Sequence, residues 1–167
     1  MTITLIGMPA VGKSCMGRQL SRKLKMRLID GDKLIEQVTG RALQDIIDED
    51  GLDAFKAIEE QVLLSIKDDN VIIAPGGSAV YYPSVMEHFK EKGIVVYLYA
   101  SPEVITHRIG DFSKRGVALK PGQTITDLYL ERAPLFEKYA DVMVSFDGSD
   151  FGKYHFDAFN KISKYLK

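Results

Sequence analysis

The chain has 167 residues, of which 46% are hydrophobic and 27% charged, with a formal net charge of −1 and one cysteine. This length and composition predict a single soluble domain, residues 1–167, with its own hydrophobic core. The near-neutral charge excludes a bulk attraction to nucleic acid or to an anionic membrane, and we expect neither as a partner. One cysteine cannot form an intramolecular disulfide, which is typical of a reducing compartment, so we expect a cytoplasmic protein. No segment is predicted to be a signal peptide or a membrane span, and the small size favours a monomer.

The first predicted element is a buried strand at residues 3–6, followed at once by the sequence GMPAVGKS. In the pattern G-x-x-x-x-G-K-[ST], a glycine-rich turn brings backbone N–H groups onto phosphate oxygens, the lysine reaches the β- and γ-phosphates and the hydroxyl ligates Mg²⁺. The residues that match this pattern are Gly7, Gly12, Lys13 and Ser14. A helix predicted over residues 14–25 would point its positive end at the phosphates. With both flanks present, a chance glycine-rich turn is the weaker interpretation.

Beyond this loop, strand-like and helix-like segments alternate. Short apolar runs predict strands at residues 26–29, 71–74, 94–99 and 142–145. Helical spacing of apolar residues predicts helices at residues 33–39, 43–50, 52–67, 82–92, 102–109, 125–139 and 151–166. The alternation predicts an α/β fold with a parallel sheet that helices cover on both faces. Ligands bind such sheets beyond the carboxyl ends of the strands, so the residues after each strand are the candidates for a site.

Two carboxylates follow the second predicted strand, in the sequence Asp30-Gly31-Asp32. One could support Mg²⁺, directly or through water, and the other could orient or deprotonate an attacking hydroxyl. The alternative is structural, because Asp32 could cap the helix predicted to begin at Lys33.

Glycines and arginines follow the later strands. The pair Gly76-Gly77 permits close approach of the backbone to a ligand, or forms a turn without one. Arg108 and Arg115 could stack on a base or clamp a phosphoryl group, or be solvated surface charges. Arg132 has apolar neighbours in a predicted helix and therefore needs a partner, for which a ligand carboxylate is one candidate. The histidines lie in predicted helices away from the strand ends and are weak catalytic candidates.

The segment at residues 110–124, GDFSKRGVALKPGQT, has no clear hydrophobic period. We interpret it as a mobile lid over the site, of the kind that excludes water from phosphoryl transfer. An ordinary surface loop is the alternative.

The order and spacing of several blocks resemble the shikimate kinase family from end to end. The blocks are GMPAVGKS, LIDGDKLIE, GRALQDIIDEDGLDAFKAIEEQVL, IIAPGGSAV, VVYLYASPEVITHRI and LYLERAPLFEKYAD. The resemblance implies a three-layer P-loop kinase fold of the nucleoside-monophosphate-kinase type, with a five-stranded parallel sheet, a lid and an acceptor-binding helical region at about 31–62. It also implies transfer of the γ-phosphoryl group of ATP, with Mg²⁺, to the 3-hydroxyl of shikimate, in aromatic amino acid biosynthesis.

The resemblance further implies roles for individual residues. The nucleotide site would comprise Gly7, Ala10, Val11, Gly12, Lys13, Ser14, Cys15 and Arg108. Shikimate would contact Asp32, Lys56, Gly76, Gly77 and Arg132, with Pro9 and Phe55 on the pocket wall. The catalytic residues would be Lys13, Asp32 and Arg115, and the metal would be held by Ser14 and Asp30.

The sequence departs from the family pattern in three places. Lys56 replaces an arginine that helps bind the shikimate carboxylate, and lysine keeps the charge but lacks the planar fork. Ser78 replaces the third glycine of a triplet, so its side chain either crowds the acceptor or adds a hydrogen bond. The family's lid pattern Arg-Pro-Leu-Leu reads Arg-Gly-Val-Ala at residues 115–118. Two alternatives stay open: a kinase of the same fold for another small hydroxylated acceptor, such as a gluconate-like acid, and a nucleotide-binding regulator without catalysis.

Overall fold

A computed structural model describes residues 1–110, 117 and 119–166. Its strands are β1 (Thr2–Ile6), β2 (Arg27–Asp30), β3 (Val71–Ala74), β4 (Gly93–Tyr99) and β5 (Val142–Ser145). Its α-helices are α1 (Lys13–Leu24), α2 (Gly31–Thr39), α3 (Leu43–Asp50), α4 (Leu52–Leu64), α5 (Pro83–Lys92), α6 (Pro102–Ile109), α7 (Ile125–Tyr139) and α8 (Phe151–Ser163). A short 3₁₀ helix, η1 (Gly77–Tyr81), follows β3.

The five strands form one parallel sheet in the order β2-β3-β1-β4-β5. At its centre, Ile3 of β1 pairs with Ile72 of β3 on one side and with Ile94 of β4 on the other. Every residue of β1 and of β3 is buried, which explains why β3 is a continuous apolar run and why the only polar residues of β1 are the threonines Thr2 and Thr4. The predicted α/β class and parallel sheet are confirmed.

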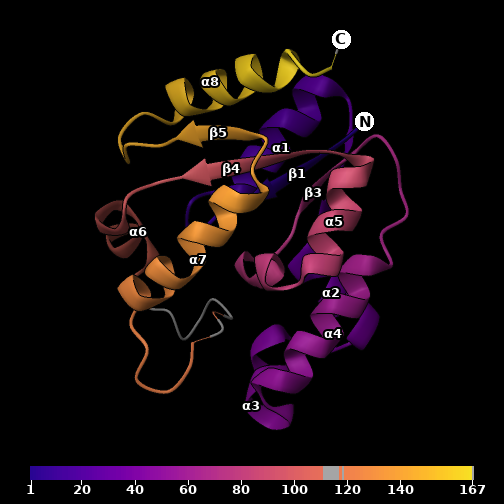
Figure 1. Cartoon of the computed structure of the whole chain (residues 1–167), viewed down its shortest axis with the longest axis vertical. Coiled ribbons are helices and arrows are strands. Elements are labelled where there is room, and N and C mark those ends of the chain that lie inside the picture. Colours follow the sequence, from indigo (N-terminus) through magenta and orange to yellow (C-terminus); the bar gives the residue numbers. More distant parts are fainter. Residues whose placement is uncertain (111–116, 118, 167) are drawn as a thin grey trace.

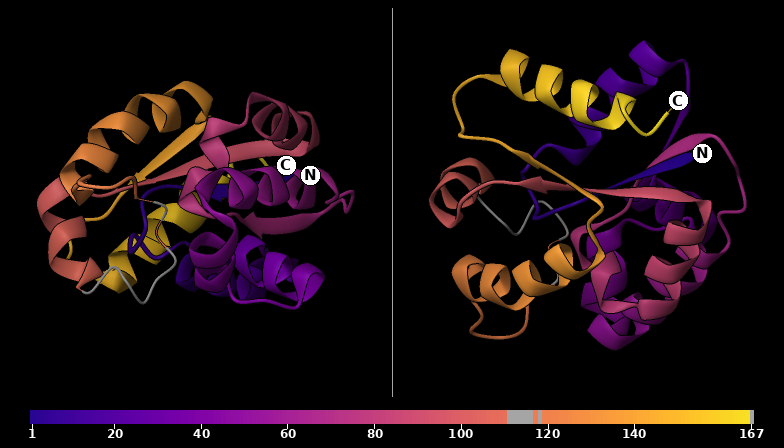
Figure 2. Two further views of the ribbon diagram at one scale, coloured as in Figure 1. Left: turned by 90° about the horizontal axis from the view of Figure 1, so that it is seen from below. Right: turned by 45° about the horizontal axis from the view of Figure 1, so that its top comes forward.

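Helices cover both faces of this sheet (Figure 2). On one face, α1 packs on β1, β2 and β3, and α8 packs on β5 and on α1. On the other face, α5 packs on β1 and β4, and α7 packs on β4. The molecule therefore has three layers, and the carboxyl ends of all five strands point to the same end of the sheet.

A separate helical group, α2 to α4, lies at one end of the molecule (Figure 1). It has a small core of its own, formed by Ile35, Leu43, Ile46, Phe55 and Val62. This group coincides with the region at 31–62 that was expected to bind the acceptor.

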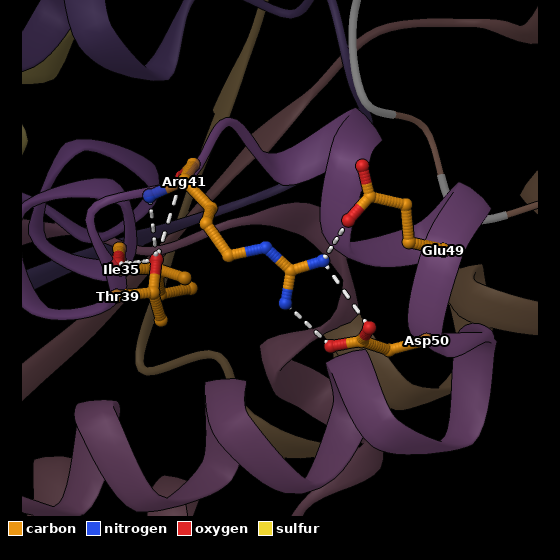
Figure 3. Close-up of polar contacts among 5 residues, drawn as sticks. All are labelled: Ile35, Thr39, Arg41, Glu49 and Asp50. Carbon is orange, nitrogen blue, oxygen red and sulfur yellow. Dashed lines mark hydrogen bonds and ion pairs between the residues drawn. The ribbon is translucent and has the colours of Figure 1, made fainter.

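One arginine, in the loop after α2, connects that loop to α3 (Figure 3). The guanidinium of Arg41 contacts Asp50 through both of its terminal nitrogens, at 2.6 and 3.2 Å, and Glu49 at 2.7 Å. The backbone N–H of Arg41 donates to the hydroxyl of Thr39, which itself donates to the carbonyl of Ile35 at 2.8 Å. The loop after α2 is thus fastened to the far end of α3.

The structure corrects one local expectation beside the phosphate-binding sequence. The second strand ends at Asp30 instead of residue 29, and α2 begins at Gly31. Asp30 is the residue that caps α2, because its Oδ1 accepts from the backbone N–H of Lys33 at 3.2 Å. Asp32 lies in the first helical turn, so it does not cap the helix as the structural alternative required.

The end of the predicted lid coincides with a well-capped helix start. Thr124 accepts through its hydroxyl from the N–H of Asp127, and Asp127 accepts in return from the N–H of Thr124, at 3.1 and 3.0 Å. This reciprocal box fixes where α7 begins. Among the described residues, no helix has the length and hydropathy that a bilayer-spanning segment requires.

Candidate active site

The loop between β1 and α1 curls around the side chain of Lys13. The Nζ of Lys13 donates to the carbonyls of Gly7 and Met8, at 2.9 Å each. Gly12 immediately precedes the helix with a φ of +94°, in the left-handed region that glycine adopts most readily. The first N–H groups of α1 therefore open onto the space beside the lysine, an arrangement suited to binding an anion.

The two candidate metal ligands lie together beside this loop. The hydroxyl of Ser14 donates to the Oδ2 of Asp30 at 3.0 Å. Mg²⁺ prefers oxygen ligands and is commonly held by one or two protein groups plus phosphates and water. A hydroxyl and a carboxylate at this separation fit such an ion.

A cleft of about 380 Å³ opens beyond the strand ends. Most of the predicted site residues lie on its wall, namely Pro9, Ala10, Gly12, Lys13, Ser14, Cys15, Asp30, Asp32, Phe55, Gly76, Gly77, Arg108 and Arg132. Glu59, Ser78 and Val117 also line it. One cleft therefore unites residues from six helices, η1 included, with others from β2 and from loops.

Four predicted site residues do not line the described part of the cleft or cannot be placed. Gly7 begins the loop, and its carbonyl accepts from the ammonium of Lys13. Val11 is buried, and its carbonyl accepts from the hydroxyl of Tyr154 at 3.2 Å. The ammonium of Lys56 lies 5.4 Å from the ring centre of Tyr81, beside the cleft. Arg115 lies outside the described residues.

Charged groups in the cleft shift one another's pKa. Burial lowers the pKa of Lys13 to about 8; the charge of Asp32 opposes this effect and that of Arg132 adds to it. Burial raises the pKa of Asp32 to about 6; the charge of Lys13 opposes this effect and that of Glu59 adds to it. A carboxyl with a pKa near 6 is ionised at neutral pH but is more basic than an exposed aspartate, as proton acceptance requires.

The glycine pair gives the acceptor end of the cleft its shape. A Cβ atom on Gly76 would lie 2.9 Å from the Oδ1 of Asp32 and 3.0 Å from the Oε2 of Glu59. A Cβ atom on Gly77 would lie 2.6 Å from the Nη1 of Arg132. Because neither residue has a side chain, two carboxylates and a guanidinium can converge on the same stretch of backbone.

Arg132 is the largest charged side chain in the interior, with 2% of its surface exposed. Its Nε donates to the hydroxyl of Tyr81 at 3.2 Å. In the described part of the chain, no carboxylate forms an ion pair with it, although Arg132 lowers the pKa of Glu59 through its charge. A buried guanidinium that faces a cleft in this way suits a carboxylate ligand.

Sequence reasoning missed the residue that anchors this end of the site, Glu59, which is 1% exposed. Its Oε1 accepts from the hydroxyls of Ser78 and Tyr82, the latter at 2.8 Å. Burial raises the pKa of Glu59, and the two hydrogen bonds oppose that rise. Ser78 thus adds a hydrogen bond to the wall of the cleft, which was one of the two effects considered for it.

At the other end of the cleft, Arg108 lies on the wall and aromatic rings pack against its guanidinium. The Nε of Arg108 donates to the carbonyl of Ala10 at 2.8 Å, and its guanidinium lies 5.0 and 4.8 Å from the ring centres of Phe146 and Phe151. The thiol of Cys15 lies 3.9 Å from the Nε2 of His155. The planar surface of Arg108 beside the phosphate-binding loop suits a nucleotide base.

Known proteins resemble this chain in sequence and in architecture. A family model described as shikimate kinase matches residues 9–160. The shikimate kinase of Paracidovorax citrulli is 37% identical over 150 residues, which cover 87% of this chain and 82% of the relative. That of Francisella tularensis subsp. novicida is 33% identical over 168 residues, which cover 98% of this chain and 93% of the relative.

Solved structures agree. The shikimate kinase from Acinetobacter baumannii in complex with shikimate matches with a TM-score of 0.85 at 29% identity, over 99% of this chain and 95% of that one. The shikimate kinase from Aquifex aeolicus matches with a TM-score of 0.84 at 26% identity, over 99% and 98%. The P-loop kinase fold implied by the resemblance is therefore confirmed, and the chain belongs to the shikimate kinase family.

Proposed function

We propose that this chain transfers the γ-phosphoryl group of ATP to the 3-hydroxyl of shikimate, giving shikimate 3-phosphate and ADP. The observation that carries the proposal is the single cleft in which a phosphate-binding loop with Lys13 meets Asp32 and the buried guanidinium of Arg132. One end suits a nucleotide and the other a small hydroxy acid. Family membership supports the same reaction.

At the nucleotide end, the loop from Gly7 to Ser14 would hold the phosphates with its N–H groups and with Lys13. Arg108 would lie against the adenine, supported by its own contacts to Phe146 and Phe151. Ser14 and Asp30 are the residues that would hold Mg²⁺, directly or through water. When bound, the ion would neutralise charge on the β- and γ-phosphates.

At the acceptor end, Arg132 would bind the shikimate carboxylate and Asp32 would hold the 3-hydroxyl. Gly76 and Gly77 allow the ring of the acceptor to approach the backbone between them. Lys56 would add positive charge on the carboxylate side. The likeness to a solved shikimate kinase in complex with shikimate supports this class of acceptor.

The reaction would be a direct in-line transfer. The oxygen of the 3-hydroxyl forms a bond to the γ-phosphorus, the bond from that phosphorus to the bridging oxygen of ADP breaks, and the hydroxyl proton passes to Asp32. The raised pKa of Asp32 favours that last step. Lys13 and Arg115 would offset charge on the transferring group, and closure of residues 110–124 would exclude water.

Release of ADP from Mg·ATP, measured with shikimate, quinate and gluconate as parallel acceptors, tests the proposal. Saturable turnover on shikimate supports it. Turnover on another acceptor alone would replace shikimate with that compound. Binding of ATP without turnover on any acceptor would favour a regulator.

We also propose that the protein is cytoplasmic and monomeric. One cysteine is typical of a reducing compartment, and the small size and near-neutral charge are compatible with a monomer. Sedimentation equilibrium at several protein concentrations tests the oligomeric state.

A further inference from the structure

One aromatic ring contacts both cations at the acceptor end of the cleft. Tyr81 is the last residue of η1, and its hydroxyl accepts from the Nε of Arg132 at 3.2 Å. Its ring centre lies 5.2 Å from the Cζ of Arg132 and 5.4 Å from the Nζ of Lys56. Lys56 and Arg132 come from α4 and α7, so Tyr81 connects two helices that carry the positive charge of this end.

The charges of this group are close enough to act on one another. Both Arg132 and Lys56 lower the pKa of Glu59, the buried carboxylate on the same wall. Glu59 thus lies within electrostatic reach of both cations, and the hydroxyl of Tyr81 also lowers the pKa of Glu131 through a hydrogen bond. Two cations gathered at one end of the cleft suit an anionic ligand there.

The contact to Tyr81 leaves part of the arginine available. A guanidinium has five N–H donors, and the hydrogen bond to Tyr81 uses only the one on Nε. The Nη1 atom lies against Gly77, on the wall of the cleft. The hydroxyl of Tyr81 therefore fixes the rotation of the guanidinium while the terminal nitrogens remain for a carboxylate.

The ring of Tyr81 restricts the position of the Lys56 ammonium. A lysine ends in a flexible point charge without the planar fork of arginine. An aromatic face attracts an ammonium within about 6 Å of its centre, so it restricts where that charge lies. Lys56 is held in this way at the edge of the cleft, although it does not line it.

We propose that Tyr81 is a positioning residue for the acceptor carboxylate: its hydroxyl orients Arg132, and its ring holds Lys56 on the same side of the cleft. This inference rests on the proposed function. The contacts of Tyr81 are with the two cations of the acceptor end, so we expect its effect to fall on acceptor binding and not on the transfer step.

Two substitutions separate the hydroxyl from the ring. Tyr81→Phe removes the acceptor of the Arg132 hydrogen bond and keeps the aromatic face, whereas Tyr81→Leu removes both. Tyr165→Phe is the matched control, because Tyr165 is exposed and near the end of the chain. Lys56→Met, alone and combined with Tyr81→Leu, tests the contact between the ring and the ammonium.

We expect Tyr81→Phe to raise the KM and Kd for shikimate about threefold to tenfold, the range of one lost hydrogen bond, and Tyr81→Leu to raise them further. The kcat and the KM for ATP should stay within about twofold of the wild type. Part of the Tyr81→Leu effect should vanish when Lys56 is already Met. Tyr165→Phe should change nothing.

Unchanged shikimate binding in Tyr81→Phe and Tyr81→Leu, in a wild type that turns over shikimate, would overturn the inference and leave the proposed function intact. Parallel changes in kcat and in both KM values would also overturn it, because they indicate a general structural role. A wild type that does not phosphorylate shikimate would instead contradict the proposed function. Should Tyr81→Leu fail to fold, Tyr81→Phe still decides, since it keeps the ring that packs there.

Discussion

Gly77 lies directly against the guanidinium of Arg132, so closely that a Cβ atom at residue 77 would be 2.6 Å from Nη1. Carbon and nitrogen atoms that are not bonded do not lie this close together, so one of the two would have to move. The arginine is 2% exposed, so it has little room to move within the interior. The absence of a side chain at residue 77 is therefore a condition for the position of Arg132.

This contact predicts the effect of Gly77→Ala. The added methyl group would displace Arg132 from the cleft wall, and we expect the KM for shikimate to rise about tenfold or more, equivalent to at least about 1.4 kcal/mol of lost binding. Binding of ATP should be affected less, because the added Cβ would lie 3.3 Å from the carbonyl oxygen of Gly7 and 3.4 Å from the Cδ of Pro9 in the phosphate-binding loop, both longer than its contact with Nη1. Steady-state kinetics with each substrate varied in turn measures both. A normal KM for shikimate in a folded Gly77→Ala protein would show that Arg132 does not bind the acceptor.

The shifted pKa values of Asp32 and Lys13 predict how activity depends on pH. Asp32 must be ionised to accept a proton, so kcat/KM should fall as the pH drops through about 6. Lys13 must be protonated to offset phosphate charge, so kcat/KM should fall again as the pH rises through about 8 in the free enzyme. A pH–rate profile from 5 to about 9 should therefore be bell-shaped.

The acidic limb of that profile can be assigned with a variant. Asp32→Asn keeps the size of the side chain and removes the base, so turnover should fall by about two to four orders of magnitude while ATP affinity is kept. A profile that is flat down to pH 5 in the wild type, or near-normal turnover in Asp32→Asn, would remove Asp32 from the reaction.

Much of this architecture could be predicted from residue patterns, because its causes are local. Apolar runs such as the one before Gly7 specify buried parallel strands, and the glycine-rich loop specifies its own conformation. The limits of elements were less predictable. Asp30 was predicted to follow its strand, but its backbone still belongs to β2 and pairs with Ala74 of β3. Its side chain at the same time caps α2. A hydrogen bond between a side chain and a later backbone group is invisible to periodicity.

The buried carboxylate of Glu59 could have been found but was not. In the sequence it is one of two adjacent glutamates in an amphipathic helix, which suggests a solvated face. Its spacing indicates the opposite, because it lies four residues after Phe55 and three before Val62, both of which are buried. Its partners Ser78 and Tyr82 are distant in the sequence, so their convergence needed the fold.

Arg41 provides a test of the helical group that is independent of the cleft. Its ion pairs with Glu49 and Asp50 lie at the surface, where salt screens charges efficiently. Arg41→Ala should lower the melting temperature at low ionic strength, and the difference from wild type should shrink at about 1 M salt, where the Debye length is about 3 Å. Asp50→Ala should give a similar loss, and the double variant should lose less than the sum. A difference that does not depend on salt would show that Arg41 acts through packing.

The hydrogen bond from Ser78 to Glu59 predicts a loss of stability that grows with pH. Ser78→Ala removes one of two hydroxyl donors to a buried carboxylate, and we expect a loss of about 1–2 kcal/mol when that carboxylate is ionised. Burial raises the pKa of Glu59 in the folded state, so folding stability decreases as the pH rises through that pKa; the two hydrogen bonds limit this decrease because they favour the charged form. Without the Ser78 hydroxyl the charged form of Glu59 is less stabilised, so the loss of folding stability in the variant should be larger at pH 8 than at pH 4, where more of the carboxyl is protonated.

Urea unfolding of wild type, Ser78→Ala and Tyr82→Phe at both pH values measures this loss. Tyr82→Phe should behave like Ser78→Ala, because it removes the other donor to Glu59. An equal deficit at both pH values would mean that Ser78 stabilises the fold by packing and that its hydroxyl does not hold the charge of Glu59.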